Sequence, residues 1–562
     1  MWSWTDLVID ELDILRYQLA WNRLLAVVEE QAQVLMRTAF STVVREAGDL
    51  SAGVFDPTGR MLAQAVTGTP GHVNAMAASV GKFLLKHPVD QLVEGDVLLT
   101  NDPWDGTGHL NDFTVVTPVF LQRNCIGLFA STSHIADVGG RGFGPDANDL
   151  FEEGIRIPIS YLFCEGRRDE TLMRLIKANV RDPETAEGDL YSLTTCNDKG
   201  ATALLEMMAD FDLEDLDEVG RFILESSRVA MEKEIAQLPK GRFEAQMRID
   251  GYREPVDIVA ALEIADGVVK VDFTGSSKVS SAGINVPLPY TEAYASFGVR
   301  CVVGNEVPNN AGSLAAVQVT APEGCILNAL PPSAVSARHS VGQMLPDVVL
   351  GCLAQVIPEK VPAEGASCIW NPVFLSSSDD GGNTQSGQFV TNPIYNGGTG
   401  ARPVKDGLST TAFPSGVRTT STEVNEATTP LVIWRKEYRT DSGGPGVRRG
   451  GLGQIVEISH REGAPFVVSR MFDRIEYPAR GRFDGHDGSP GRVYIRNGDV
   501  LPGKGRDVIP AGVTLVFETP GGGGIGEPAM RDAASIQADM DAGLVSEKSA
   551  VEIYSHSVPD RT

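Results

Sequence analysis

The period of the hydrophobic residues changes near residue 240, and this change constrains the fold more than any other feature. Before it the spacing is mostly helical, over residues 5–45, 72–88 and 170–235, with a hairpin pattern at 51–65 and short strand patterns at 96–99, 113–120 and 125–131. After it, residues 242–252, 256–275 and 313–324 alternate and carry many β-branched residues. We therefore expect an α+β fold with several subdomains, in which a helical and mixed N-terminal part is followed by a β-rich C-terminal part.

A chain of 562 residues is longer than one compact core usually holds. The 60 glycines and 33 prolines predict many turns and irregular segments, most of all in the last third. We place boundaries near residues 240 and 380. The predicted regions are 1–240, mixed α/β; 241–380, β-rich with a helix at 340–357; and 381–562, Gly-rich and β-rich with a helix at 531–543.

The charge balance argues against several classes of partner. The chain has 74 acidic and 48 basic residues, a net charge of −26, which repels nucleic-acid phosphates and anionic lipids. The N-terminus is acidic without a basic and apolar leader, and no stretch reaches the roughly 18 apolar residues of a spanning helix. We expect a cytoplasmic protein that binds neither nucleic acid nor membrane, with its seven cysteines as reduced thiols.

Histidines and carboxylates gather in one part of the sequence. Four of the eight histidines fall within the 63 residues from 72 to 134. Three of them, His72, His109 and His134, lie within three residues of a glycine or a carboxylate, in polar loops next to strands. His109 and Asp112 form an HxxD pair, and His134 and Asp137 form another. A borderline divalent metal prefers such imidazole and carboxylate ligands, and two histidines with one carboxylate leave positions open for chemistry. A single HxxD is usually a surface pair or a turn; two pairs 25 residues apart favour a metal site.

Other carboxylates could support such a site. Asp102 and Asp137 are candidates to orient ligating histidines. Asp49 lies in a Gly-flanked loop before a predicted hairpin and is a candidate ligand or general base.

The sequence has no complete motif for nucleotide binding in a P-loop or for catalysis by a serine or cysteine nucleophile. Residues 498–505 have the GxxxxGK spacing, but Gly505 stands where Ser or Thr is needed and no helix pattern follows. GxSxG, HExxH and cysteine-nucleophile signatures are absent from the sequence. Arg338 and His339 precede a predicted helix and could bind an anion or the substrate; a structural arginine buried against carboxylates is the alternative.

Several segments, in order from about residue 8 to residue 555, together resemble the hydantoinase B/oxoprolinase family. They include REAGDLSAGVFDPTGRMLAQ at 45–64, TPGHVNAM at 69–76, NDPWDGTGHLNDFTVVTPVF at 101–120, SHIADVGGRGFGP at 133–145, DSGGPGVRRGGLG at 441–453 and TPGGGGIGEP at 519–528. The chain departs from the family motifs at two places. Relatives often read ERxDFS where this chain reads REAGDLS, which keeps Glu46 and Asp49. They read THLPD where this chain reads GHLND at 108–112.

The resemblance implies a division of labour between two subunits. An ATPase-like A subunit phosphorylates the substrate oxygen, and the B subunit carries out the next step. Known members open cyclic amides such as hydantoins, 5-oxoproline and lactams, an amidohydrolase activity of the EC 3.5.2 type. In related ketone carboxylases a metal sits on an HxxD pair plus a later histidine, which correspond here to His109, Asp112 and His134.

On this basis we expect a divalent ion, zinc, manganese, iron or cobalt, on those three residues. Asp49, His72 and Asp137 are the candidate catalytic groups, Arg338 and His339 the substrate-binding residues, and Asp102 and Glu46 the residues that orient the site. The expected partners are a cyclic-amide substrate and an A-type subunit that uses ATP, in an α2β2 or larger hetero-oligomer. Two alternatives remain: a subunit of an ATP-dependent ketone carboxylase, and a non-catalytic scaffold with a structural metal.

Overall fold

The computed structural model describes residues 11–67, 69–377 and 389–556. Helices and sheets alternate through these residues in a mixed α+β architecture, which confirms the expected fold class. None of the helices described is both long enough and apolar enough to span a lipid bilayer. Residues 5–10, the start of the first predicted helical stretch, lie outside the described residues.

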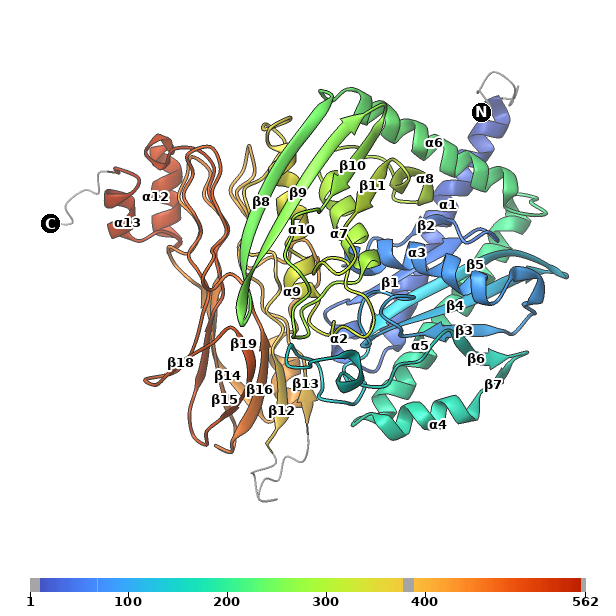
Figure 1. Cartoon of the computed structure of the whole chain (residues 1–562), viewed down its shortest axis with the longest axis horizontal. Coiled ribbons are helices and arrows are strands. Elements are labelled where there is room, and N and C mark those ends of the chain that lie inside the picture. Colours follow the sequence, from blue (N-terminus) through green and yellow to red (C-terminus); the bar gives the residue numbers. More distant parts are fainter. Residues whose placement is uncertain (1–10, 68, 378–388, 557–562) are drawn as a thin grey trace.

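The first part of the chain is built on a sheet of strand order β2-β1-β5-β4-β3-β6-β7 (Figure 1). Its strands are β1 (Leu50–Phe55), β2 (Met61–Gln64), β3 (Val97–Thr100), β4 (Asp112–Leu121), β5 (Asn124–His134), β6 (Ser160–Cys164) and β7 (Arg167–Arg168). The helices are α1 (Glu11–Thr38), α2 (Thr42–Arg45), α3 (Pro70–Lys86), α4 (Glu170–Asn179), α5 (Pro183–Asp210) and α6 (Asp217–Ala236).

This sheet is buried on both faces, because neighbouring residues of a strand point to opposite sides. Val115 and Phe129 pack into one core with residues of α1 and α5. Val116 and Leu128 pack into a second core with residues of α3. Double burial fits the adjacent apolar residues in the middle of each strand, Val115 and Val116 in β4 and Leu128 and Phe129 in β5.

A second sheet has the order β11-β10-β9-β8 and is covered by helices on one side (Figure 1). Its elements are β8 (Gly241–Tyr252), β9 (Glu254–Ala265), β10 (Val268–Asp272), α7 (Leu288–Arg300), α8 (Ala311–Leu314), β11 (Val317–Thr320), α9 (His339–Gly342) and α10 (Leu345–Leu353). The helix predicted at 340–357 is thus two helices. Pro346, at the start of α10, is tolerated in a first turn but lacks the N–H that a continuous helix needs there.

The last third contains two sheets, of orders β13-β12-β16-β19 and β14-β15-β20-β17-β18. Their aromatic faces form one core, in which Trp370 stacks on Phe472 with ring centroids 4.3 Å apart. The strands are β12 (Val373–Ser376), β13 (Val390–Thr391), β14 (Leu431–Tyr438), β15 (Gln454–His460), β16 (Phe466–Met471), β17 (Arg492–Ile495), β18 (Val500–Leu501), β19 (Lys504–Ile509) and β20 (Leu515–Glu518), with helices α11 (Thr422–Thr428), α12 (Ala533–Asp541) and α13 (Glu547–Glu552).

Glycines of three sequence segments pack backbone against backbone in this third. Gly451 donates to Thr399 O (2.8 Å), and Gly522 donates to Gly451 O (3.0 Å). A Cβ atom on Gly398 would lie 1.8 Å from Gly451 O, so no other residue fits there. We call residues 397–400, 450–453 and 521–524 the glycine layer. Close backbone approach, rather than phosphate binding, accounts for its glycines.

The predicted three-part division of the chain stays a prediction. One hydrophobic core draws on residues from Phe143 to Met471 and so contains side chains from all three predicted regions. The second predicted boundary falls within residues 378–388, outside the described residues.

Candidate metal centre

The register of β4 and β5 brings two of the predicted metal ligands together. Asp112, the first residue of β4, pairs directly with His134, the last residue of β5. His109 lies in the loop just before β4, and its Nε2 atom is 2.7 Å from Oδ1 of Asp112. Candidate ligand atoms of these three buried residues all lie within 4.8 Å of one another.

Two more predicted residues reach the same point from β1 and α3. Asp49 directly precedes β1, which pairs with β5. His72 lies in the first turn of α3. Its Nε2 atom is 2.9 Å from Oδ2 of Asp112, and its Nδ1 atom is 3.5 Å from Oδ1 of Asp49. The Thr69 hydroxyl donates to Asp49 at 2.8 Å.

Arg338 approaches Asp112 from the other side. Its guanidinium forms an ion pair with Oδ2 of Asp112, and its Nε donates to Thr107 O at 3.0 Å. It also lies over the ring of Tyr290, 4.1 Å from the centroid, and is 2% exposed. These contacts match the structural alternative considered for this residue, and direct substrate binding by Arg338 stays a prediction.

The hydrogen bonding of His109 directs the lone pair of its Nε2 atom at the carboxylate of Asp112. Its Nδ1 lies 2.9 Å from the carbonyl oxygen of Ser336, which can only accept, so Nδ1 carries the proton. Burial, assisted by the charge of Arg338, lowers the pKa of His109 to about 4, so the ring is neutral. Its bare Nε2 then faces a carboxylate oxygen at 2.7 Å. Two electron-pair donors at this separation repel each other unless a cation satisfies both.

His134 brings a second imidazole to the same place. Its Nδ1 lies 3.3 Å from Oδ1 of Asp112. Its Nε2 is buried and has no hydrogen-bond partner in the described part of the chain. Two imidazole nitrogens and a carboxylate oxygen are the donor set of a borderline divalent ion, so these residues fit the expected metal.

The groups around Asp112 stabilise its ionised form. Burial alone would raise the pKa of Asp112, but its basic neighbours outweigh it and hold that pKa well below the usual range; with His109 neutral, this effect comes from His72 and Arg338. Burial likewise opposes protonation of His72, yet the charges of Asp112 and Asp49 prevail and raise the pKa of His72. The site therefore contains both neutral imidazole for a metal and an imidazole that favours its proton.

A cavity of about 30 Å³ adjoins these residues, with room for an ion or one or two water molecules. The rings of His134 and His339 pack against Phe143 at its edge, with centroids 4.9 and 5.7 Å away. Burial, followed by the charge of Arg338, holds the pKa of His339 well below its ordinary value. The other lining residues include Asp49, His72, His109, Gln343, Asn371, Asn392 and Ser415.

Three predicted site residues do not join this group. Oδ1 of Asp137 forms an ion pair with Arg181. Asp102 accepts from Trp104 N and Arg156, and contacts no histidine in the described residues. Glu46 is partly exposed and pairs with Arg45. Their assigned roles stay predictions.

Sequence reasoning did not find Thr107, Tyr290, Phe143 and Glu153. Thr107 donates to Asp112, and Glu153 accepts from Val335 N and Ser336 N at 2.7 Å each, which fixes the carbonyl that orients His109. Thr107 lies two residues before His109, so the motif around that histidine could have revealed it. Glu153 acts through the backbone of a distant segment, which no local pattern reveals.

Comparisons with known proteins find similarity along nearly the whole chain. A model of the hydantoinase B/oxoprolinase family matches residues 13–528. A protein of Pseudomonas sp. strain NS671 that is named for the B component of a D-/L-hydantoinase is 27% identical, over 99% of this chain and 97% of its own.

Two solved structures share the fold. An ATP-dependent caprolactamase from Pseudomonas jessenii matches with a TM-score of 0.88 and 22% identity, over 99% of this chain and 98% of its own. A nucleotide-free acetone carboxylase matches with a TM-score of 0.83 and 18% identity, over 96% of this chain and 79% of its own.

Proposed function

Because this chain belongs to the hydantoinase B/oxoprolinase family, we propose that it is the B-type subunit of an ATP-dependent hydrolase of cyclic amides. Its partner is an A-type subunit that uses ATP to phosphorylate the amide oxygen, in a hetero-oligomer of at least two copies of each. The observation that carries the proposal is the convergence of Nε2 of His109 and a ligand atom of His134 on Oδ1 of Asp112.

His109, Asp112 and His134 are the residues that would hold a divalent ion. Bound there, zinc, manganese, iron or cobalt would supply a Lewis acid that polarises an oxygen of water or substrate. Arg338 and His72 compensate the charge of Asp112 and hold its second oxygen. Glu153 and Ser336 hold the proton of His109 on Nδ1 and leave Nε2 free for the ion.

The reaction that follows phosphorylation needs a proton acceptor close to the reacting carbon. Phosphorylation removes the amide resonance, so water adds to the carbon that bears the phosphorylated oxygen. Asp49 lines the cavity and takes the proton of that water, while Thr69 and His72 hold its Oδ1. Asp49 then returns the proton to the ring nitrogen. As the C–N bond breaks, the hydroxyl of the adduct gives its proton to Asp49 and becomes the carbonyl of an acyl phosphate. A second water converts this to a carboxylate and inorganic phosphate.

The small cavity also excludes bulk water from the reacting group. Phe143 and the buried rings of His339 and Tyr290 leave little room beside the ligands. An enclosed site strengthens the charge interactions that stabilise the transition state.

The test is ATP-coupled turnover of this chain together with its A-type partner on hydantoin, 5-oxoproline and a lactam. We expect ring opening without bicarbonate, abolished by chelation and by His109→Ala or His134→Ala. Retention of both metal and turnover in these two variants would refute the proposal.

A ketone carboxylase subunit is the second candidate, favoured by the fold shared with acetone carboxylase. The same assay decides between them. Product that forms only with bicarbonate and carries a new carboxylate supports the carboxylase and excludes the hydrolase. A metal shell completed by four protein ligands and without exchangeable water supports a scaffold role instead.

A further inference from the structure

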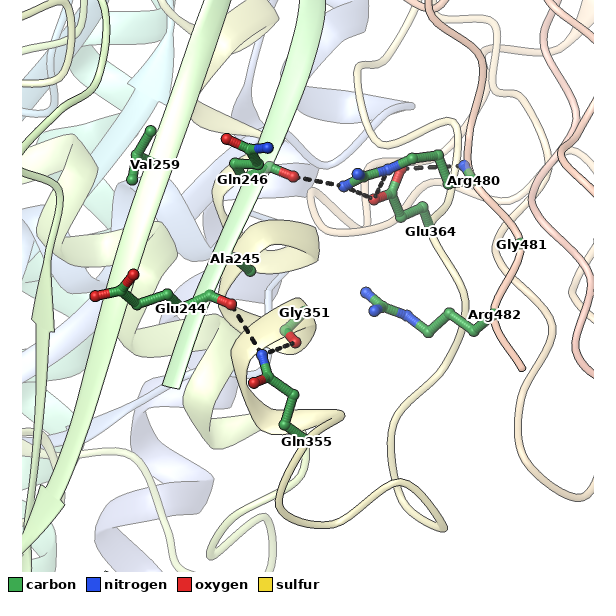
Figure 2. Close-up of a pocket in the computed structure, with 10 residues that line it drawn as sticks. All are labelled: Glu244, Ala245, Gln246, Val259, Gly351, Gln355, Glu364, Arg480, Gly481 and Arg482. Atoms are coloured by element: carbon green, nitrogen blue, oxygen red, sulfur yellow. Dashed lines mark hydrogen bonds and ion pairs between the residues drawn. The ribbon is translucent and has the colours of Figure 1, made fainter. Parts of the chain in front are cut away.

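A second, larger cavity lies between β8, the end of α10 and residues 480–482 (Figure 2). Its volume is about 480 Å³, within the range of sites for small molecules. None of the described residues that line it also lines the metal-centre cavity. The lining residues used below are Glu244, Gln246, Gly351, Gln355, Glu364, Arg480 and Arg482.

Arg482 enters this cavity without a counter-ion. Figure 2 shows its side chain extended toward Gly351, with no hydrogen bond to the other residues drawn. Its Nε donates to Pro362 O at 2.9 Å, and its Nη2 to Asp347 O at 3.3 Å. Within the described ranges, no carboxylate forms a hydrogen bond or an ion pair with its guanidinium. Burial lowers the pKa of Arg482, although the nearby charges of Glu364 and Asp347 act in the opposite direction.

The neighbouring carboxylates are committed to other cations. Glu364 accepts from Arg480 Nε at 2.7 Å and also pairs with Arg474. Asp347 pairs with the same Arg474 at 3.3 Å, and burial raises the pKa of Asp347 to about 6.

Glu244, on the cavity wall, pairs with Arg242 at 3.1 Å. Asp487 also lies close enough to Arg480 to interact with its charge. Of the three arginines at positions 474, 480 and 482, Arg482 is therefore the one whose guanidinium has no direct carboxylate partner within the described ranges.

The rest of the cavity wall consists mainly of neutral polar and small side chains. Gln355 Nε2 donates to Glu244 O (2.9 Å) and Gly351 O (3.3 Å), so its amide is fixed at the cavity edge. Gln246 lies on the opposite side and accepts from Arg480 through its backbone oxygen at 2.9 Å (Figure 2). Such a wall suits the polar body of a small metabolite rather than an apolar one.

We propose that this cavity binds a small organic anion, with a carboxylate or phosphate group held by Arg482. A guanidinium presents parallel N–H donors that match either group. A chain with a net charge of −26 repels anions in general, so an anion is retained only where a dedicated cation faces a cavity. The site is independent of the metal centre, and its occupancy does not depend on the reaction proposed above.

Titration calorimetry on the full chain tests the proposal, with inorganic phosphate and glutarate as separate probes. We expect saturable binding of at least one probe with one site per chain, weakened by about 10-fold or more in Arg482→Gln, since hydrogen bonds to charged groups are among the stronger ones. Arg123→Gln removes the same charge from the exposed β4–β5 turn and should bind as the parent does. Equal affinity in Arg482→Gln, or no saturable binding of either probe, overturns the proposal.

Chemical labelling of the unaltered protein gives a second readout that needs no variant. Phenylglyoxal modifies accessible arginines, and mass spectrometry reports each position separately. The probe that binds should slow modification of Arg482 and leave Arg123 unaffected. Unchanged modification of Arg482 at saturating probe contradicts the assignment. Neither measurement involves turnover, so either can fail while the proposed hydrolase function stands.

Discussion

Asp112 and His134 stand directly opposite each other on antiparallel strands, with Oδ1 of Asp112 3.3 Å from Nδ1 of His134. Their juxtaposition is fixed by the register of β4 and β5. A slip of one residue would turn either side chain to the other face of the sheet. The sheet therefore sets the geometry of the candidate metal centre before any loop contributes to it.

Replacement of Asp112 by asparagine should destabilise the fold as well as abolish metal binding. Arg338 would remain buried without its counter-ion, at a cost of about 3–5 kcal/mol in the free energy of unfolding. Urea denaturation measures this cost. The double variant Asp112→Asn/Arg338→Met should regain part of the stability but none of the metal binding. A single variant as stable as the parent would show that the ion pair contributes nothing.

Asp49→Asn should separate catalysis from metal binding. Loss of a general base lowers turnover by roughly 100- to 10,000-fold. Asp49 is not among the three clustered ligands, so metal content measured by mass spectrometry should stay unchanged. Asp90→Asn, a change of the same kind at an exposed position, serves as the control. Parental turnover in Asp49→Asn would remove this residue from the mechanism.

Metal binding should raise the melting temperature of the protein even when no substrate is present. A ligand at 100 times its Kd stabilises a native state by about 2.7 kcal/mol, so calorimetric melting should shift upward on addition of zinc or manganese and downward on chelation. His134→Ala should abolish the shift. Ser133→Ala should retain it, because neighbouring strand residues face opposite sides of the sheet. An equal shift in both variants would place the ion elsewhere.

Glu153 should make the protein less stable as pH rises. Burial raises the pKa of Glu153 to about 8, well above its unfolded value. Between the two values the folded carboxyl keeps a proton that the unfolded one releases, so the free energy of unfolding falls by up to about 1.4 kcal/mol per pH unit. The stabilisation that protonated Glu153 gives the folded state is complete below the pKa of the unfolded chain and is lost above the pKa of the folded chain.

Glu153→Gln cannot titrate, so its stability relative to the parent should improve steadily from pH 5 to pH 8. Urea denaturation at several pH values measures the difference. A constant difference across this range would mean that Glu153 is already ionised in the folded state at pH 5.

Gly398→Ala should disrupt the glycine layer, because the new Cβ would lie 1.8 Å from Gly451 O. We expect loss of soluble, cooperatively unfolding protein. Gly81→Ala is the matched control: Gly81 lies within α3 with nothing within 4 Å of the added carbon. Alanine favours a helix over glycine by about 1 kcal/mol, so this variant should melt at a higher temperature. Equal melting of the two variants would contradict the packing described.

Local patterns predicted most elements because hydrophobic period reports burial directly. The expected strands at 113–120 and 125–131 are β4 and β5, and the hairpin expected at 51–65 is β1 and β2. The predicted helix at 72–88 is α3, shifted by two residues toward the N-terminus, where Pro70 suits the first turn. The single helix at 340–357 was wrong, since apolar spacing continues across the break between α9 and α10.

Candidate site residues were predictable where the family motifs and strand ends coincide, as for His109, Asp112 and His134. Asp102 and Asp137 carry the same residue type in similar loops, yet Arg156 and Arg181 approach them from segments more than 40 residues away. Nothing in the local sequence signals such long-range pairing. The same limit hid Tyr290 and Glu153, which act on Arg338 and Ser336 only in the folded chain.

Arg338 joins the metal centre from a part of the chain more than 200 residues beyond Asp112. A fragment that ended near residue 240 would keep all three ligands and lose the guanidinium that compensates their carboxylate. The electrostatic environment of the three candidate ligands thus depends on a segment that is made much later in synthesis. During synthesis the triad emerges first, but its final electrostatic state is reached only when the chain beyond residue 338 has folded against it. The charge balance of this centre is therefore a property of the whole folded chain and not of the segment that carries the three residues.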